Sequence, residues 1–330
     1  MDSPTVDTLS GLLDGPRARG AFLLRSVLDP PWSLRIEDHA PLSLATMIHG
    51  NAWIVPDVGS AAQLRPGEVA IMRGPDPYVM ADEPGRRPDV IIGPGQRCTV
   101  RRGPAVAEPT NLGVRTWGDS ADGATVMLSG TYQLTGEIGQ RLLGALPPVL
   151  IRPAGPDNAL ISLLAAEIVK DEPGQELVLD RILDLLLVTI LRSWLDSPGA
   201  GAPAWYRAQH DPVVGAALRL LHSDPAGPWT VADLAAGTGV SRAALARRFT
   251  TLVGEPPMAY LTGLRLALAA DLLREPDATL GAVARRVGYG SAFALSAAFK
   301  RVRGVSPQEH RTAPRPAEIV PGTEIVPAPV

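Results

Sequence analysis

Residues 231–245 read VADLAAGTGVSRAAL. Two helices that cross closely need a small residue at the crossing, a turn residue that tolerates positive φ, and apolar residues that hold the second helix on the first. Ala235, Gly239 and Leu245 supply these residue types in that order, with Val240 beside the turn. The residues able to cap the two helices with a side-chain oxygen are Thr230 and Ser241. The stretch predicts a helix-turn-helix, although an ordinary helical hairpin shares these features.

A second copy of this pattern follows 49 residues later. Residues 280–291 read LGAVARRVGYGS, in which Ala284 and Gly288 match the small residue and the turn glycine of the first copy. The helical run between the copies, 258–274, has 17 residues and spans roughly 26 Å at about 1.5 Å per residue. With the flanking turns, the copies lie roughly 34 Å apart, which is the distance between successive major grooves on one face of DNA. This spacing favours DNA binding over a generic helical bundle.

The charge of the chain divides unevenly around the double motif. The net charge is −3, yet residues 207–313 hold 13 Lys and Arg against 8 Asp and Glu, and the remainder holds 18 against 26. A basic part joined to an acidic part is typical of a polyanion-binding module attached to a separate regulatory or catalytic module.

Upstream of the motif, short apolar runs are broken by proline and glycine. The chain has 330 residues, with 33 Gly and 33 Pro, and this length predicts two domains. Up to about residue 154 the Pro/Gly pairs recur often enough to indicate many short strands in an all-β sandwich or barrel. Residues 44–49 and 52–55 fit two strands joined at Gly50 and Asn51.

Two amphipathic helices follow the β region. Helical stripes cover residues 160–168 and 179–194 and are separated by Pro173 and Gly174. The second stripe is apolar around much of the helix circumference, so this helix needs more than one surface to pack against. Either a second copy of the chain in a homodimer or the barrel alone would meet that need.

The remaining segments predict a linker, a tail and a cytoplasmic location. The run 197–203, SPGAGAP, is predicted to be a linker, and 314–330, with five prolines, a disordered tail. Cys98 is the single cysteine, so no internal disulfide forms, and the N-terminus lacks a basic and apolar leader. The longest apolar stretch, 182–195, is interrupted by charged residues, so no segment is expected to span a membrane.

Around the double motif the chain is similar to a known family. The segments that carry the similarity extend over about 100 residues and are Trp229–Ala235, Ser241–Phe249, Gly254–Pro257, Tyr260–Leu261, Val287–Tyr289, Ala298–Arg301, Gly304–Pro307 and Arg311. On these residues the chain resembles the C-terminal domain of AraC/XylS-type transcriptional regulators. The resemblance implies double-stranded promoter DNA as a partner, with RNA polymerase as a further candidate partner.

The upstream region resembles the subgroup of this family that carries an N-terminal cupin-like barrel. The matching pieces are 50–54, 64–68, 129–132 and 146–150. The resemblance implies a multidomain α+β protein, with an N-terminal cupin-like β-barrel, a helical segment, and a C-terminal all-α domain of seven helices that contains both helix-turn-helix units. The expected divisions are the barrel at 1–154, a helical segment for dimerisation at 155–196, the linker at 197–206, the DNA-binding domain at 207–313 and the tail at 314–330.

The family pattern places the first recognition helix, Ser241–Phe249, in a major groove. The residues expected on the groove side are Ser241, Arg242, Ala243, Ala246 and Arg247. Arg242 and Arg247 are long enough to reach base edges, and an arginine paired to guanine supplies roughly 1–3 kcal/mol of discrimination. Arg247 is the first choice for this contact. Leu245 and Phe249 are expected to face the core and Arg248 to contact phosphate; the alternative is that the arginines are solvated surface residues.

The second recognition helix departs from the family pattern. Where the family often has polar residues and an arginine, this chain has Ala292, Phe293, Ala294, Ser296 and Ala297, of which only Ser296 can donate a hydrogen bond to a base. We therefore expect this unit to position the protein more than to specify sequence. The expected contacts are Ser291, Lys300 and Arg301 on phosphates and Phe293 against a thymine methyl group.

The barrel does not carry the metal-binding residues of cupin enzymes. Those enzymes hold a metal with three histidines and a glutamate, and alignment to their pattern places Glu37, His39, Ser43 and Tyr78 at the ligand positions. Only two of these four side chains are suited to a metal. No catalytic residue, metal or cofactor is therefore predicted, and His39 and His49 are interpreted as structural. A metal-dependent cupin enzyme joined to a DNA-binding domain remains the alternative.

The barrel is better interpreted as a sensor, because a small barrel can enclose one small ligand. The aromatic residues proposed as walls of an effector pocket are Trp32, Trp53, Tyr78, Trp117 and Tyr132, each of which could instead belong to the core. Cys98 is a candidate redox trigger but has no resolving cysteine. A regulator without a small-molecule effector is a third interpretation.

Overall fold

The structure is a computed structural model that describes residues 23–100, 110–132, 143–155, 158–197 and 202–313. Two compact units contain nearly all of them: residues 23–132 and 146–197 form the β unit, and residues 202–313 form the helical unit. The predicted tail and residues 198–201 of the predicted linker lie outside the described residues.

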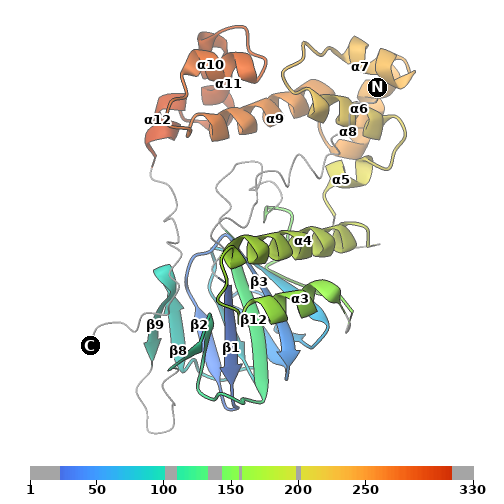
Figure 1. Ribbon diagram of the computed structural model, residues 1–330. Helices are drawn as coiled ribbons and strands as arrows, with labels where there is room; N and C mark the ends of the chain where they lie inside the picture. The colour runs from blue at the N-terminus through green and yellow to red at the C-terminus, as the bar shows by residue number, and fades with distance from the viewer. Residues whose placement is uncertain (1–22, 101–109, 133–142, 156–157, 198–201, 314–330) are drawn as a thin grey trace. The chain divides into compact units, whose positions relative to one another are not determined.

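The β unit contains two sheets (Figure 1). One has seven strands in the order β10-β11-β1-β12-β3-β6-β13, and the other has six in the order β5-β4-β7-β2-β8-β9. The strands are β1 Leu23–Leu28, β2 Ser33–Ile36, β3 Leu42–His49, β4 Ala52–Pro56, β5 Ala62–Leu64, β6 Glu68–Arg73, β7 Tyr78–Ala81, β8 Val90–Gly93, β9 Arg97–Val100, β10 Thr110–Gly113, β11 Thr116–Gly118, β12 Thr125–Tyr132 and β13 Val149–Pro153.

Side chains from both sheets fill the interior of the β unit. Alternate residues of a strand point to opposite faces, and on β3 the buried core residues Ala45 and Met47 share one face. They belong to the same apolar cluster as Met72 on β6, Ile54 on β4 and Met80 on β7. The predicted all-β sandwich or barrel is confirmed in these residues.

The two strands predicted around Gly50 and Asn51 are confirmed as β3 and β4, but they lie in different sheets. The chain passes from one sheet to the other at Gly50, which has a φ of 71°. A Cβ atom at this position would lie 2.9 Å from the carbonyl oxygen of Ala124, so only glycine fits both the backbone angle and the space.

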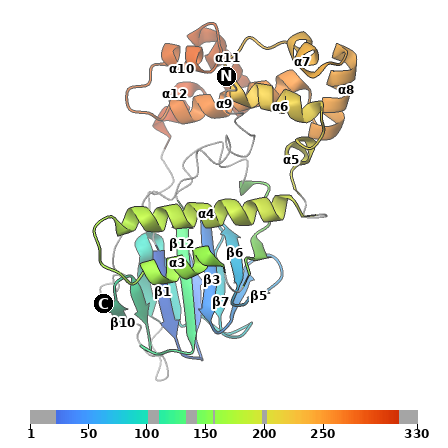
Figure 2. The same ribbon diagram turned by 45° about the vertical axis from the view of Figure 1, so that its right-hand side comes forward.

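Helices α3, Ala159–Glu167, and α4, Gln175–Leu195, confirm the two predicted helical stripes. Figure 2 shows both helices beside the seven-stranded sheet. Leu183 of α4 packs against Gly130 of β12, and the Tyr132 hydroxyl donates a 2.7 Å hydrogen bond to the Leu183 carbonyl oxygen. On other sides of α4, Leu177 and Leu185 are exposed. Packing on the sheet is therefore observed, and the homodimer stays a prediction.

The helical unit contains eight helices in the residues described, one more than the seven predicted, because α5 begins inside the segment predicted as the linker. They are α5 Ala204–Ala208, α6 Val214–Ser223, α7 Val231–Thr238, α8 Arg242–Val253, α9 Pro257–Leu272, α10 Leu280–Arg286, α11 Ala292–Arg303 and α12 Pro307–Thr312. Pro257 and Pro307 are the first residues of α9 and α12, where a missing N–H costs no helical hydrogen bond. Among the described helices, none is long and apolar enough to cross a membrane.

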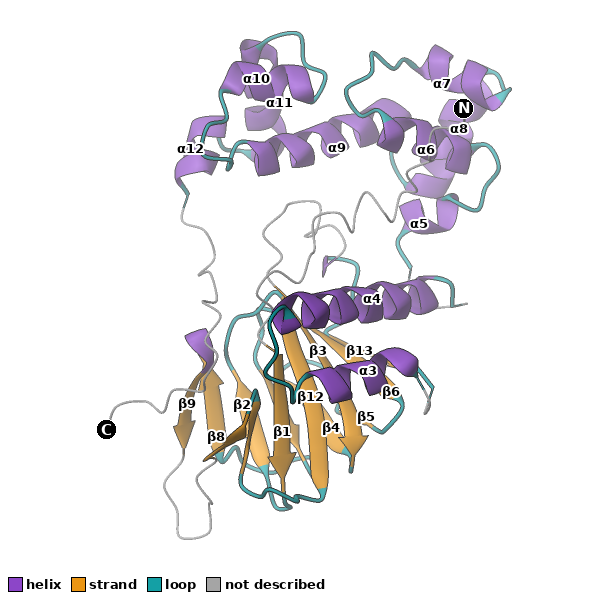
Figure 3. Ribbon diagram, in the orientation of Figure 1, coloured by secondary structure: helices purple, strands orange, loops and turns teal. Residues whose placement is uncertain are grey.

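Two separate cores lie along α9. The first contains Leu234, Leu245 and Phe249 together with Leu261 of α9, and the second contains Val283, Leu295 and Phe299 together with Leu266 of α9. Figure 3 shows α9 between the α7–α8 pair and the α10–α11 pair. Its 16 residues correspond to about 24 Å, so one helix supports both pairs.

Candidate nucleic-acid interface

Local hydrogen bonds hold the first helix-turn-helix. The Thr230 hydroxyl accepts from the backbone N–H of Asp233, and the Asp233 carboxylate accepts from the Thr230 N–H, so α7 begins with a capping box. The helix ends at Gly239, whose φ is 70°. The Ser241 hydroxyl then accepts from the Ala244 N–H and begins α8. Both predicted N-caps are confirmed, and each satisfies a donor that the first helical turn cannot satisfy itself.

The second helix-turn-helix repeats this construction. Thr279 caps α10, Gly288 has a φ of 79°, and the Ser291 hydroxyl accepts from the Ala294 N–H at the start of α11. In α11 Leu295 and Phe299 are buried, as Leu245 and Phe249 are in α8. Both helices have 12 residues and end at a glycine of positive φ. The two units are therefore structural copies of each other.

Most of the predicted groove-facing residues of α8 are exposed. These are Ser241, Arg242, Ala243 and Arg247, while Ala246 is half-buried. Neither Arg242 nor Arg247 forms an ion pair with another residue in the described part of the chain. Two guanidinium groups and two small side chains thus lie on one surface of a capped helix.

Arg248 has a protein partner that the sequence did not suggest. Its Nη2 atom lies 2.6 Å from Oδ2 of Asp211, whose other carboxylate oxygen accepts from the N–H groups of Val213 and Val214 at the start of α6. Burial raises the pKa of Asp211, but these N–H donors and Arg248 outweigh it and lower the pKa overall. Asp211 precedes Arg248 by 37 residues, so no local pattern indicated the pair. Contact between Arg248 and phosphate stays a prediction, and it requires the ion pair to open.

The exposed surface of α11 is apolar near its start and basic near its end. Ser291, Phe293, Lys300 and Arg301 are exposed and Ser296 is half-buried. Phe293 is 83% exposed, which is more than any other exposed large apolar side chain in the described residues. The Arg303 guanidinium lies 5.2 Å from the centre of the buried Phe299 ring and stabilises the last turn by a cation–π contact.

Two contacts that were not predicted from the sequence involve the loop before α7. Arg265 of α9 donates hydrogen bonds of 2.7 and 2.6 Å to the carbonyl oxygens of Pro225 and Gly227, in the loop before α7. In the same loop, Ala226 lies against Gly288, where a Cβ atom would be only 2.4 Å from the Ala226 oxygen. The single arginine inside the apolar run 261–273 was the available signal.

In the β unit, the structure brings together three of the five predicted effector-pocket aromatics. Trp32, Tyr78 and Trp117 belong to the interior cluster, where Trp32 Nε1 donates to Thr125 and Trp117 Nε1 donates to Ser26. Trp53 alternates with the inward-facing Ala52 and Ile54 and therefore lies on the outer face. Tyr132 packs under α4. These two do not share a pocket wall with the other three, because strand alternation turns them away from the interior.

The four residues aligned with cupin metal ligands do not form a metal site. Glu37 pairs with Arg35 at 2.6 Å, and His39 is exposed, whereas Ser43 and Tyr78 are buried. In the described part of the chain, no three His, Cys, Asp or Glu side chains are grouped so as to hold a metal. Cys98 is buried, and burial raises the pKa of its thiol to about 12, so the thiol is protonated at neutral pH.

Polar groups nevertheless gather at one end of the interior. Ser43 and Thr131 pair across β3 and β12 and share the inward face with Ala45 and Met47. The Thr131 hydroxyl is buried and has no hydrogen-bond partner among the described residues. Burial, followed by the nearby charge of Asp38, raises the pKa of Tyr78, whose hydroxyl bonds to Ser43. Asp38 itself is buried and accepts hydrogen bonds from the Ala40 N–H and from Gln96 Nε2.

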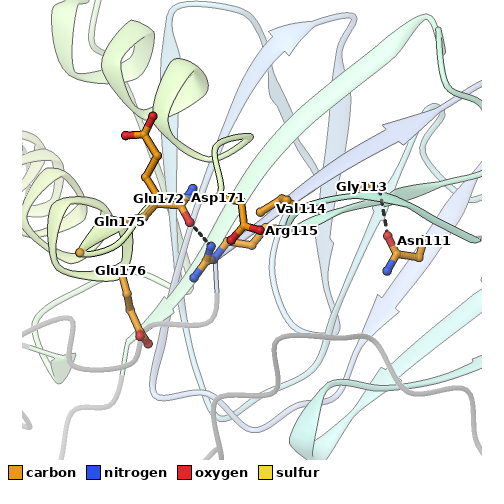
Figure 4. A pocket seen from close by; sticks show the side chains of 9 residues that line it. Asn111, Gly113, Val114, Arg115, Asp171, Glu172, Gln175 and Glu176 are labelled. Atoms are coloured by element: carbon orange, nitrogen blue, oxygen red, sulfur yellow. Dashed lines mark hydrogen bonds between the residues drawn. The ribbon is translucent and has the colours of Figure 1, made fainter.

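A groove of about 550 Å³ lies on the outside of the β unit (Figure 4). It is lined by Asn111, Gly113, Val114, Arg115, Asp171, Glu172, Gly174, Gln175 and Glu176. Arg115 donates a hydrogen bond to Gln175 Oε1 and so ties the β10–β11 turn to the start of α4. None of the five predicted aromatics lines this groove. Its three carboxylates favour a cationic ligand over an anionic one.

Comparison with known proteins shows similarity over both parts of the chain. Residues 7–196 match a family model described as Cupin, and residues 234–313 match one described as Helix-turn-helix domain. An AraC-like transcription regulator of Streptomyces lividans is 30% identical over 315 residues, covering 94% of this chain and 99% of that protein. A second, from Streptomyces antibioticus, is 40% identical over 195 residues, covering 58% of this chain and 64% of the relative.

A solved structure also matches the C-terminal part. It is the DNA-binding domain of AdpA in complex with a target DNA, which is 33% identical and covers 31% of this chain and 90% of that chain, with a TM-score of 0.29.

Proposed function

The chain belongs to the AraC-like transcription regulators, and from this membership we propose that α8 and α11 each enter a major groove of promoter DNA. The observation that carries the proposal is the duplicated construction of the helical unit, in which each second helix begins at a serine cap and leaves one surface exposed. The excess of basic residues in 207–313 supports a polyanionic partner.

In this proposal α8 supplies the hydrogen-bonded base contacts. Arg242 and Arg247 are exposed, and a guanidinium group pairs in bidentate fashion with O6 and N7 of guanine. Ala243 is small, so it allows the helix backbone to approach the groove floor. The ion pair between Arg248 and Asp211 orients α8 against α6.

Lys300 and Arg301 of α11, together with Ser291 at its N-terminus, are proposed to contact phosphates. Phosphate contacts position a protein without reading sequence. Both cations lie in the second half of α11 and are exposed, whereas the first half carries the apolar side chains. This division separates the positioning part of the helix from its base-facing part.

We expect Lys300→Ala to weaken binding to all duplexes by the same factor. When the variant binds DNA it neutralises one phosphate fewer and therefore releases one counterion fewer. The slope of log K against log salt concentration should then decrease in magnitude by about 1. Fluorescence anisotropy at several salt concentrations, on duplexes selected from genomic fragments and on random duplexes, measures both quantities. Lys170→Ala in the β unit removes the same charge and serves as the control. A Lys300→Ala chain with the wild-type slope, or with altered base preference, would contradict the assignment.

We further propose that a small molecule regulates DNA binding from the polar end of the β interior. The ligand class that fits is a molecule with one hydrogen-bonding end and an apolar body. The support is the buried, unpartnered Thr131 hydroxyl beside Ser43, together with the buried ring of Tyr78, whose hydroxyl bonds to Ser43. Such a ligand controls activity only if it binds two arrangements of the protein with different affinity.

A metabolite screen by thermal shift tests this proposal. A ligand at 100 times its Kd should stabilise the β unit by about 2.7 kcal/mol. Thr131→Val removes the unpartnered hydroxyl at nearly constant volume, so it should leave the ligand-free melting temperature unchanged or higher while reducing the shift. If Thr131→Val retains the full shift, the ligand binds elsewhere. If no metabolite produces a shift, a regulator without a small-molecule effector is favoured.

A further inference from the structure

The two recognition helices have the same frame but different chemistry on the exposed surface. Ser241 and Ser291 are equivalent caps, and the buried Leu and Phe of each helix follow at the same spacing. In this alignment Arg242 and Arg247 of α8 correspond to Ala292 and Ala297 of α11, and Ala243 corresponds to Phe293. The two positions that carry guanidinium groups in α8 therefore carry only methyl groups in α11.

Two of these apolar side chains form one exposed surface in the first half of α11. Phe293 is 83% exposed, and Ala297 is exposed on the same face, four residues further along the helix. An isolated exposed apolar residue needs no explanation. The Phe293 ring, however, lies at the position that faces the bases in the proposed function, and it is not part of the apolar core of the second helix-turn-helix unit.

Exposed cations lie on the same two helices. Lys300 and Arg301 follow on α11, and Arg285 and Arg286 are exposed at the end of α10, where Arg286 lies 3.5 Å from the Glu275 carboxylate. An apolar protein partner would gain nothing from these cations, whereas DNA combines a polyanionic backbone with apolar groups in its major groove. The apolar group in that groove is the 5-methyl of thymine.

We propose that Phe293, with Ala297, reads thymine by contact with its 5-methyl group. The inference rests on the proposed function, and it extends that function from positioning to sequence recognition by α11. A phenyl ring has no hydrogen-bond donor or acceptor, so it cannot distinguish guanine, cytosine or adenine by their polar edges. The two units then read different chemistry: α8 reads guanine through hydrogen bonds, and α11 reads thymine through apolar contact.

Methyl deletion in the DNA tests this directly. The 330-residue chain is titrated with its selected duplex, in which the thymines of the α11 site are replaced by deoxyuridine, leaving every hydrogen-bonding group in place. We expect Kd to rise about fourfold for each contacted methyl, the factor that ~0.8 kcal/mol per buried carbon corresponds to. The same replacement at the α8 site should change Kd by less than twofold.

Two variants complete the experiment. Phe293→Ala should weaken binding to the thymine duplex and abolish the difference between thymine and deoxyuridine. Val302→Ala, which shortens another exposed apolar side chain of α11 in its last turn, should keep that difference.

The outcomes separate this inference from the proposed function. If the protein binds DNA in a salt-sensitive manner but does not distinguish thymine from deoxyuridine, the inference is overturned and the proposed function stands. If Phe293→Ala binds both duplexes as wild type does but fails to regulate transcription, the surface belongs to a protein partner and the inference is again overturned. If no duplex binds, both fail.

Discussion

Gly288→Ala is expected to lower the free energy of unfolding of the helical unit by about 2–5 kcal/mol. A residue with a Cβ in the left-handed region costs roughly 1–2 kcal/mol, and overpacking a close contact costs about 1–3 kcal/mol more. Gly288 meets both conditions, because its φ is 79° and its Cβ would lie 2.4 Å from the Ala226 oxygen and 2.8 Å from the Ala226 Cα. These are backbone atoms, so no side-chain rotation relieves the contact.

Two other glycines of the same unit provide matched controls. Gly239 is the equivalent residue of the first turn and has a φ of 70°, but a Cβ there meets nothing within 4 Å, so Gly239→Ala should cost only the backbone term of about 1–2 kcal/mol. Gly290 has neither a positive φ nor a close neighbour, and Gly290→Ala should fall within about 0.5 kcal/mol of wild type. Calorimetry of the full chain measures the series. Equal effects at Gly288 and Gly239 would show that contact with Ala226 does not matter.

Arg247→Ala should reduce affinity for the selected duplex about five- to 150-fold, which corresponds to the roughly 1–3 kcal/mol of a bidentate arginine–guanine pair. Affinity for random duplexes should decrease far less, because on these duplexes the arginine contributes only its general attraction to the phosphate backbone. Repeating the selection with the variant should show relaxed preference at a single base position. Anisotropy titrations on the original and reselected duplexes provide the numbers.

Arg247→Lys is the informative control, since it keeps the charge but replaces the planar fork by a point charge. If paired hydrogen bonds to guanine account for the effect, lysine should recover the nonspecific affinity and only part of the specificity. Full rescue by lysine, or a uniform loss on all duplexes, would move Arg247 from base recognition to phosphate contact.

The features that the sequence predicted correctly are local. Thr230 and Ser241 could be assigned as caps because a capping side chain bonds to a backbone N–H two or three residues away. The burial of Leu245 and Phe249 follows from helical periodicity. Gly239 and Gly288 could be matched because both turns need the same backbone angle. The helix-turn-helix frame and most of its exposed residues could therefore be predicted from the sequence, whereas Ala246 and Ser296 are half-buried.

The features that the sequence missed join residues far apart in the chain. Arg265 reaches a loop about 40 residues away, and Asp211 pairs with Arg248 across 37 residues. Which face of the sheet Trp53 and Tyr132 occupy depends on the register of their strands, because a register shift of one residue moves each side chain to the opposite face. No periodicity reports such contacts. The sequence indicated which aromatic residues could line a pocket, but it did not indicate whether they would line the same one.

The environment of Cys98 has a practical consequence for experiments on this protein. Cys98 is the only cysteine of the chain and is 7% exposed, and its thiol has a pKa of about 12. Alkylating reagents react with the thiolate form of cysteine. The Cys98 thiol of the folded chain should therefore react very slowly with maleimide dyes. A cysteine introduced on a solvent-facing position of α6 or α12 would then carry a fluorophore or spin label at one known place, without first removing the native sulfur.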